Sequence, residues 1–314
     1  MELGREHPCG SLYHLDGWID YRVVVEKVGA IMQATLRRVR IEDKARVIQI
    51  EEKATPNLRY LGTMFEHWVH DDVGEFCVAE VGNKLVGVGK FTILYDGSAW
   101  LEALRVIPEV QGQGIGKKFY RRFFDLAEEK RLPAMRMYTG IKNQASKGLA
   151  EKFGLRVAAT CKGASCRVNP GVNAGSFRLL RPDAGALSVD RLFREVKNTW
   201  GRFCVMNRTF YEVTPDLVRS WLDECKLYVD PEGGTFLSLG ARFQADLCLH
   251  VGFVGGDFQR ALDFANAKAV ELGVPSISCL YPAGNAELEE VLHKNGWHPD
   301  PSDYLVMEVL REDS

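Results

Sequence analysis

The chain has 314 residues, of which 46% are hydrophobic, and its formal net charge is −2. This composition is typical of a globular protein with a buried core, and it provides no general attraction to nucleic acid or to a membrane surface. No apolar run approaches the roughly 18 residues that cross a bilayer, and the eight cysteines form no C-x-x-C pair, which excludes the usual zinc spacing and favours reduced thiols in a cytoplasmic protein.

The first 32 residues show no basic start followed by an apolar segment, so we interpret them as an N-terminal extension rather than a signal peptide. Beyond them, apolar periodicity and turn signals predict a run of strands and helices. The clearest local signal is the dipeptide Gly82-Asn83, which favours a two-residue hairpin turn. The expected elements are strand 35–40, helix 41–54, helix 61–70, strands 75–81 and 84–93, strand 99–107, a helix after 114, strand 134–138 and helix 144–153.

The segment QGQGIG at 111–116 is a glycine-rich turn between the strand 99–107 and the next helix. Glycines let a backbone approach a ligand with its N–H groups turned inward, and a helix N-terminus carries partial positive charge. The turn therefore suits a pyrophosphate. The cations that follow crowd the same positive end, where they are unfavourable unless an anion docks; they are Lys117, Lys118, Arg121 and Arg122. A solvated basic face is the alternative interpretation.

Three kinds of phosphate-binding loop can be compared with this turn. The third glycine stands one position early for a dinucleotide fingerprint, and Lys118 occupies the place where a P-loop has Ser or Thr. Gln111, Gly114 and Gly116 instead match the acyl-CoA loop of the GCN5-related N-acetyltransferases (GNAT), where Gln or Arg is followed by two spaced small residues. The turn thus resembles the GNAT family.

The resemblance extends on both sides of the turn. The strand LEALRVIPE leads into it as in many members, and Asn143 and Gly154-Leu155 fit the start and end of the following helix. The resemblance implies a mixed-sheet α/β acyl-CoA N-acyltransferase fold, in which acetyl-CoA lies between two splayed strands and no metal is needed. In many members a Tyr at the position of Ala150 donates a proton to the departing thiolate of coenzyme A. In this chain another group or water would have to donate that proton. The implied acetyl-CoA contacts are Leu104, Arg105, Val106, Gln111, Gly112, Gln113, Gly114, Ile115, Gly116, Lys117, Asn143 and Ser146.

Two residues are candidates for catalysis. Strand alternation places Glu102 on one face with Trp100, Leu104 and Val106. As a lone carboxylate among apolar neighbours, Glu102 is expected to have a raised pKa and to serve as general base for the attacking amine. The alternative is that Glu102 faces solvent or forms an ion pair with an Arg such as Arg105. The resemblance implies that a backbone N–H of this strand, for which we choose Val106, stabilises the reacting oxygen.

The chain resembles itself at an offset of about 142 residues. Leu132-Pro133 falls on Val274-Pro275, Asn143 on Asn285, and 153–155 on 295–297. Matches in the same order predict two copies of one fold. The expected organisation is an extension over 1–32, a catalytic GNAT domain over 33–172 and a degenerate GNAT-like domain over 173–314.

The second copy differs where the co-substrate would bind. At the same offset the turn 111–116 falls on FVGGDF at 253–258, which lacks the Gln and places Asp257 where a phosphate would sit. We therefore expect the second copy to brace the first or to complete a substrate cleft.

The leading hypothesis is an N-acetyltransferase that moves an acetyl group from acetyl-CoA to a small primary amine, such as a free amino acid, by direct attack. The alternatives are a protein N-terminal or lysine acetyltransferase and an acyl-CoA-binding sensor without turnover. The expected partner is the small-molecule amine alone, without nucleic acid or membrane, for a cytoplasmic monomer or homodimer.

Overall fold

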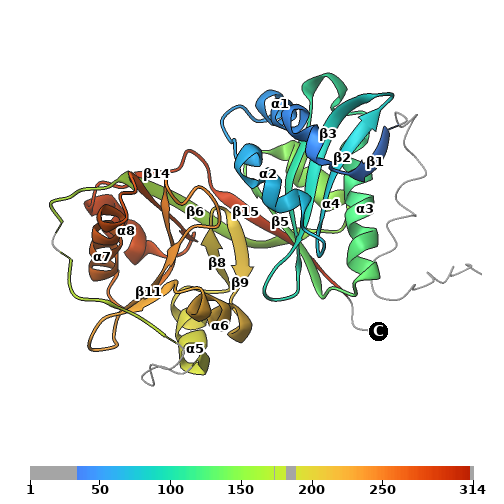
Figure 1. Ribbon diagram of the computed structural model, residues 1–314. Helices are drawn as coiled ribbons and strands as arrows, with labels where there is room; N and C mark the ends of the chain where they lie inside the picture. Colours follow the sequence, from blue (N-terminus) through green and yellow to red (C-terminus); the bar gives the residue numbers. More distant parts are fainter. Residues whose placement is uncertain (1–33, 173, 182–188, 312–314) are drawn as a thin grey trace, which may run out of the picture.

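The computed structural model describes residues 34–172, 174–181 and 189–311, so the expected N-terminal extension lies outside the described residues. The chain forms two lobes that share one long mixed sheet with helices packed on it (Figure 1). We call the lobe that contains α1 to α4 the front lobe and the lobe that contains α5 to α8 the rear lobe. The predicted mixed α/β fold is confirmed.

The front lobe follows the predicted elements closely. The hairpin predicted over 75–81 and 84–93 is confirmed, and Gly82 has the left-handed φ of 58° that such a turn needs. The elements are β1 Ala34–Arg38, the 3-10 turn Ile41–Asp43, α1 Lys44–Ala54, α2 Leu61–Val69, β2 Glu75–Val81, β3 Lys84–Ile93, β4 Ala99–Val106, the 3-10 turn Pro108–Val110, α3 Ile115–Glu129, β5 Ala134–Gly140, α4 Gln144–Lys152 and β6 Arg156–Arg167.

The rear lobe repeats this order of elements, with an extra hairpin, β8–β9, between its first two helices. Its elements are β7 Arg178–Leu179, α5 Val189–Thr199, β8 Phe203–Met206, β9 Thr209–Glu212, α6 Pro215–Asp223, β10 Leu227–Val229, β11 Phe236–Gly240, β12 Leu249–Gly255, α7 Phe258–Glu271, β13 Ser276–Pro282, α8 Ala286–Lys294, β14 His298–Pro299 and β15 Tyr304–Leu310.

The ungapped alignment of the glycine-rich turn with 253–258 is wrong. Residues 253–255 belong to β12, and only 256–257 separate that strand from α7, whereas 107–114 separate β4 from α3. The connection in the rear lobe is therefore six residues shorter, and the rear lobe has lost the loop rather than exchanged its residues.

The two lobes exchange strands. In the sheet order β1-β2-β3-β4-β5-β15-β6-β13-β12-β11-β10-β7, the last strand of the chain, β15, lies between β5 and β6. The first part of β6 pairs with β15, and its second part pairs with β13 of the rear lobe. The predicted boundary at residue 172 thus divides the chain but not the sheet, because each lobe is completed by a strand from the other part of the chain.

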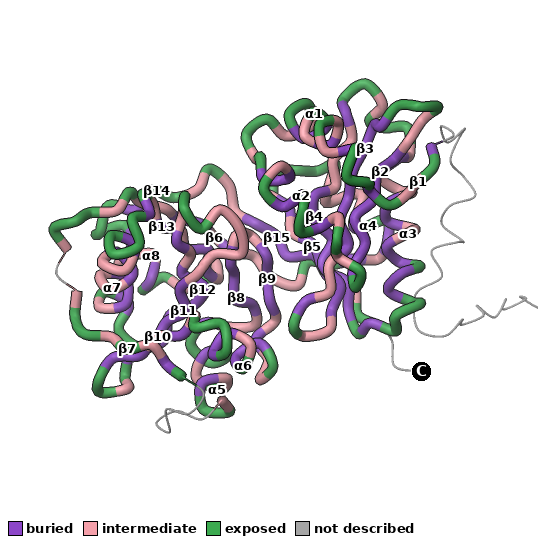
Figure 2. The backbone as a smooth tube through the Cα atoms, in the orientation of Figure 1, coloured by how far each residue is buried: buried purple, intermediate pink, exposed green. Residues whose placement is uncertain are grey.

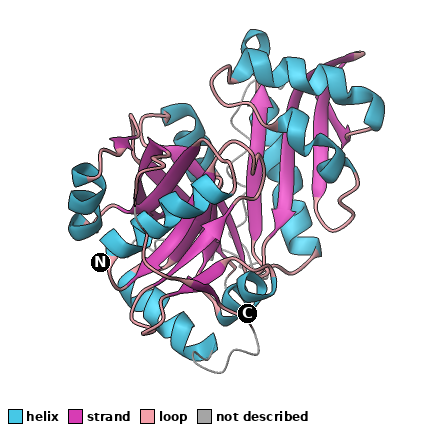
Figure 3. Ribbon diagram, turned by 60° about the vertical axis from the view of Figure 1, so that its left-hand side comes forward, coloured by secondary structure: helices cyan, strands magenta, loops and turns pink. Residues whose placement is uncertain are grey.

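Buried strands form the centre of both lobes, as the purple segments of Figure 2 show. In the front lobe, Phe119 and Phe123 of α3 pack on β3 where it carries Gly89, and a Cβ at that glycine would approach Phe119 to 2.9 Å. The glycine lets α3 lie close to the sheet. Figure 3 shows the helices lying over the strands. This packing fixes the start of α3, and hence the glycine-rich turn, beside the end of β4.

Candidate functional site

The two central strands of the front lobe separate. Within the described residues, β4 and β5 pair only through Ala99 with Met135 and Trp100 with Arg136, although β4 continues to Val106. The expected splay is therefore present. It leaves a gap between the second halves of the strands, where backbone polar groups can meet a ligand.

A bulge changes which side chains face this gap. The register of β4 against β3 shifts by one residue around Ala103, whose φ is 57°. An extra residue reverses the alternation of faces beyond it. Arg105 therefore shares the face of Glu102, and the predicted common face of Glu102, Leu104 and Val106 is wrong.

The backbone of Val106 points into the gap. The neighbouring Ile107 donates its N–H to Val86 O on β3 at 2.9 Å, and alternate residues of a strand direct their polar groups to opposite sides. The carbonyl of Val106 accepts a hydrogen bond from Gln111 Nε2 at 2.9 Å, away from β3. The Val106 N–H therefore faces the opening, as a donor to a bound carbonyl requires.

Glycine is needed at the three positions of the turn for two different structural reasons. Gly112 and Gly114 have φ values of 77° and 82°, which favour glycine, and Gly114 is the N-cap of α3 with no side-chain cap. Gly116 lies inside the helix, where a Cβ would come within 3.0 Å of Leu149 on α4. The first two glycines thus shape the turn, the third allows close packing, and the first N–H groups of α3 remain available to an anion.

The basic side chains that follow the turn differ in whether they form ion pairs within the protein. No described residue forms an ion pair with Lys117 or Lys118. Arg122 binds Glu75 through two hydrogen bonds of 2.8 and 2.7 Å, which raise the pKa of the guanidinium. The charge of Arg122 is thus matched within the protein, and Lys117, Lys118 and Arg121 are the remaining cations of this group, of which Arg121 has a buried Nη2 without a hydrogen-bond partner among the described residues.

Asn143 is the N-cap of α4, and the equivalent Asn285 of the rear lobe is the N-cap of α8. The Oδ1 atom of Asn143 accepts a hydrogen bond from the backbone N–H of Ser146 at 3.1 Å and so caps α4, and Asn285 caps α8 through Leu288 N at the same distance. Because the cap persists in the lobe without the glycine-rich turn, capping alone accounts for the repeated Asn. The co-substrate contacts of Asn143 and Ser146 stay predictions. Ala150, in the same helix, is fully buried.

Glu102 is not a lone carboxylate, as was predicted. Arg242 of the rear lobe donates to both of its oxygens, at 2.6 and 2.7 Å, and Thr92 Oγ1 donates to one of them at 2.5 Å. The alternative partner Arg105 instead lies 5.8 Å from the centre of the Tyr60 ring. Glu102 therefore links the lobes, and little of its hydrogen-bonding capacity remains free.

The loop that carries Arg242 covers the same face of β4. Asn207 Oδ1 accepts the backbone N–H of Arg242, at 2.5 Å, and that of Phe243, at 3.3 Å. The Phe243 ring stacks on Tyr60 with centroids 5.0 Å apart and planes 16° apart. The rear lobe thus closes the side of the site opposite α3.

A cavity of about 230 Å³ lies under this cover and is lined by both lobes. Sequence reasoning missed most of its walls, because the rear residues lie more than 90 positions from the glycine-rich turn and carry no motif. The lining residues are Leu58, Tyr60, Trp100, Glu102 and Tyr138 from the front lobe, and Asn207, Arg208, Thr209, Phe243, Gln244, Leu247, Cys248, His250, Ser278 and Leu280 from the rear lobe.

Within residues 34–172, 174–181 and 189–311, no three His, Cys, Asp or Glu side chains gather to hold a metal ion, and no helix is long and apolar enough to cross a membrane. The expectations of no metal and of a cytoplasmic location stay predictions.

Comparisons with known proteins agree with this geometry. Residues 40–155, which contain the splay and the turn, match the Acetyltransferase (GNAT) family model. Residues 40–155 belong to the GNAT family. The protein is therefore an acyltransferase. Over 124 residues, the chain is 24% identical to a Bacillus subtilis (strain 168) protein described as "Putative ribosomal protein bS18-alanine N-acetyltransferase", covering 40% of this chain and 82% of that protein.

Solved structures extend the likeness beyond the GNAT segment. A GCN5-related N-acetyltransferase from Sphaerobacter thermophilus has a TM-score of 0.65 at 13% identity, covering 90% of this chain and 97% of its own. N-myristoyltransferase from Saccharomyces cerevisiae, with bound myristoyl-CoA, has a TM-score of 0.59 at 11% identity, covering 98% and 90%. Identities this low show a shared fold, and the coverage includes both lobes.

Proposed function

We propose that this protein is an acetyl-CoA-dependent N-acetyltransferase whose acceptor is a small primary amine held in the cavity between the lobes. The observation that carries the proposal is the position of this cavity. Its front wall contains Trp100 and Tyr138, which belong to the two splayed strands, and its rear wall closes it against Tyr60. An amine there would approach the gap from the side opposite α3.

The co-substrate side of the proposal rests on the turn and the splay. The N–H groups at the start of α3 and the positive φ glycines suit the diphosphate, and Lys117 and Lys118 would add charge. When bound in the gap, acetyl-CoA supplies a thioester carbonyl. The N–H of Val106 would hydrogen-bond its oxygen, so that charge developing on the oxygen is stabilised. Leu104 and Arg105 would line the same stretch of strand.

The reaction needs an amine that has lost its proton. The amine nitrogen forms a bond to the acetyl carbon, the carbon–sulfur bond breaks, and the thiolate takes up a proton from water, because Ala150 offers none. Glu102 is the proposed base, acting at the lone pair that Arg242 and Thr92 leave unused. The ion pair with Arg242 also fixes the orientation of the Glu102 carboxylate, and a general base must be oriented toward the proton that it removes.

A protein acceptor is the competing function, since the Bacillus relative is described as acting on a ribosomal protein alanine. That relative has little length left to match a rear lobe, because the 124 aligned residues cover 82% of it. Here the rear lobe covers the acceptor side of β4, and a cavity of about 230 Å³ is below the size of a typical drug pocket. A small acceptor therefore fits this chain better than a protein chain does.

The experiment is thiol release from acetyl-CoA with purified full-length protein and a panel of amino acids, polyamines and peptides. We expect turnover with small amines and little with peptides. Efficient acetylation of peptides would favour the protein acceptor. Calorimetric binding of coenzyme A without turnover of any amine would favour the sensor.

A further inference from the structure

The β8–β9 hairpin brings a strained arginine to the cavity. Its two turn residues, Asn207 and Arg208, both have left-handed φ values, of 47° and 59°. A two-residue turn of this kind ordinarily has glycine at the second position, because a side chain there is strained. Strain of this sort is retained where a side chain is needed for binding. The Arg208 side chain lines the cavity.

The charge of Arg208 is only partly matched by the protein. Its closest carboxylate oxygen is Asp300 Oδ2, at 4.0 Å, and that oxygen already accepts a hydrogen bond from Tyr304 at 2.6 Å. The opposite wall offers no compensation, because the Glu102 carboxylate is paired with Arg242. The guanidinium also lies 5.4 Å from the centre of the Tyr304 ring and interacts with the Tyr138 side chain, but neither of these groups is a carboxylate. The cavity thus presents a cation whose closest carboxylate oxygen is 4.0 Å away.

A second polar group on the same wall also lacks a partner. The Nε2 atom of His250 is buried and has no hydrogen-bond partner among the described residues, and the side chain lines the cavity beside Ser278. Burial and the charge of Arg208 lower the pKa of His250 to about 4, so the ring is neutral at pH 7. A buried polar atom without a partner is costly unless a ligand supplies one.

We propose that the acceptor carries a carboxylate as well as its amine, and that Arg208 and His250 bind this carboxylate. The acceptor class is therefore amino acids. The inference deepens the proposed function and rests on it. A guanidinium and a neutral imidazole N–H are both donors suited to carboxylate oxygens. The cavity wall also contains Tyr60, Trp100 and Phe243, so an apolar or aromatic side chain of the acceptor would find apolar partners there.

The test compares amino acids with the amines that remain after their carboxylate is removed: phenylalanine with phenethylamine, leucine with isoamylamine. We expect kcat/KM to favour the amino acid by about tenfold to 100-fold, the worth of charge-assisted hydrogen bonds to one carboxylate. Arg208→Gly should remove this preference by lowering kcat/KM for amino acids alone. Because glycine relieves the left-handed turn, its melting temperature should not fall.

The matched control is Arg131→Gly, which removes an exposed arginine that also has a left-handed φ, of 52°, at the end of α3. It should leave the preference intact. Equal kcat/KM for both members of each pair in the wild type, or equal losses for both in Arg208→Gly, would overturn the inference while the proposed function stands. If no amine is acetylated, calorimetric titration of the same pairs in the presence of coenzyme A decides, and binding without amino-acid preference overturns it.

Discussion

α3 and α7 begin at equivalent places in the two lobes, but their N-termini differ in the length of the preceding loop and in the N-cap. Each helix follows a central strand that separates from its parallel neighbour, since β12 pairs with β13 only through residues 249–251 among the described residues. The loop before α3 has eight residues, 107–114, and its N-cap, Gly114, has no side chain to use. The loop before α7 has two, and its N-cap, Asp257, accepts the N–H of Arg260 at 3.0 Å.

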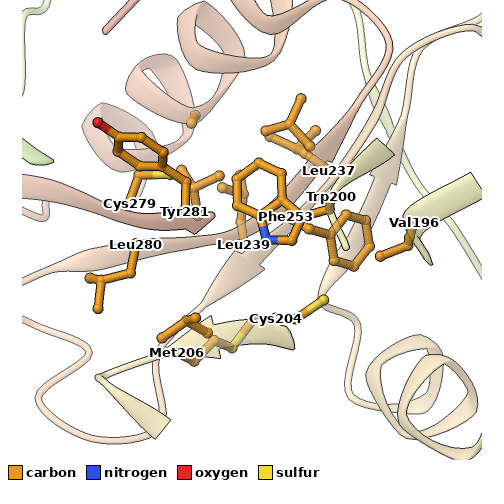
Figure 4. Packing of buried hydrophobic residues seen from close by; sticks show 14 of the residues in the cluster. Val196, Trp200, Cys204, Met206, Leu237, Leu239, Phe253, Cys279, Leu280 and Tyr281 are labelled. Atoms are coloured by element: carbon orange, nitrogen blue, oxygen red, sulfur yellow. The ribbon is translucent and has the colours of Figure 1, made fainter. Parts of the chain in front are cut away.

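The comparison shows that a helix dipole alone does not make an anion site. In the rear lobe the helix supplies its own negative group, and this carboxylate accepts the N–H of Arg260 in the first turn. In the core of the rear lobe, Trp200 packs among Leu237, Leu239 and Phe253 (Figure 4), and it also lines a cavity with Gly256 and Phe258 at the start of α7 and Asn285 at the start of α8. The supported difference between the lobes is the cap: the N-cap of α3 is a glycine without a side-chain acceptor, so the first N–H groups of that helix are left for an anion.

The largest expected effect comes from giving the front helix the cap of the rear one. Gly114→Asp places a carboxylate where the diphosphate is proposed to bind, and like charges in contact cost several kcal/mol, so affinity for coenzyme A should fall by at least about 1,000-fold. Calorimetric titration measures it. Gly273→Asp, at another left-handed glycine in the rear lobe, is the control. Wild-type affinity in Gly114→Asp would remove the turn from the co-substrate site.

Glu102→Gln tests the proposed base, which only the front lobe has. General-base assistance is worth about 100-fold or more, so kcat at neutral pH should fall by about that factor and recover partly at high pH, where more of the amine is free. Pre-steady-state and steady-state rates across pH measure it. If Glu102 only orients Arg242, Arg242→Gln will cause the same loss, the double variant will add nothing, and high pH will restore neither.

Acid should weaken the fold through His250, which lies on β12 of the rear lobe. Its folded pKa of about 4 is below the ordinary 6.5, so the unfolded chain binds the proton first, and the stability contribution present above pH 6.5 is lost as pH falls toward 4. Allowing for partial exposure, the loss should be about 2 kcal/mol. Urea unfolding of His250→Gln should show a shallower pH dependence than wild type or the exposed control His298→Gln. Equal slopes would contradict the assignment.

The smallest effect is expected when the carboxylate that caps α7 in the rear lobe is removed. Asp257→Ala should cost about 1 kcal/mol of unfolding free energy, the usual value of an N-cap, and should leave coenzyme A affinity unchanged. Asp257→Ser retains a capping oxygen and is the control. Appearance of a second coenzyme A site in Asp257→Ala would contradict the view that the missing loop, and not the acid alone, closed this lobe to the ligand.

Local chemistry accounts for the parts that sequence reasoning predicted. The Gly82-Asn83 hairpin, the strand 99–107 and the turn at 111–116 each depend on residues close in the chain, and each was found within a residue or two of its expected place. The bulge at Ala103 was missed because nothing in LEALRV distinguishes a bulged strand from a regular one. The face assignments of Leu104 and Val106 failed with it.

The sequence by itself determined the glycine-rich turn at a helix start, the repeat and the family resemblance, because these depend on short-range backbone conformation and spacing. Only the tertiary structure decided that β15 completes the front lobe, that Arg242 pairs with Glu102 from 140 positions away, and that Arg208 and His250 share a cavity with Trp100. Such contacts depend on how the strands of a shared sheet are ordered, and side chains far apart in the chain meet only after that order is set.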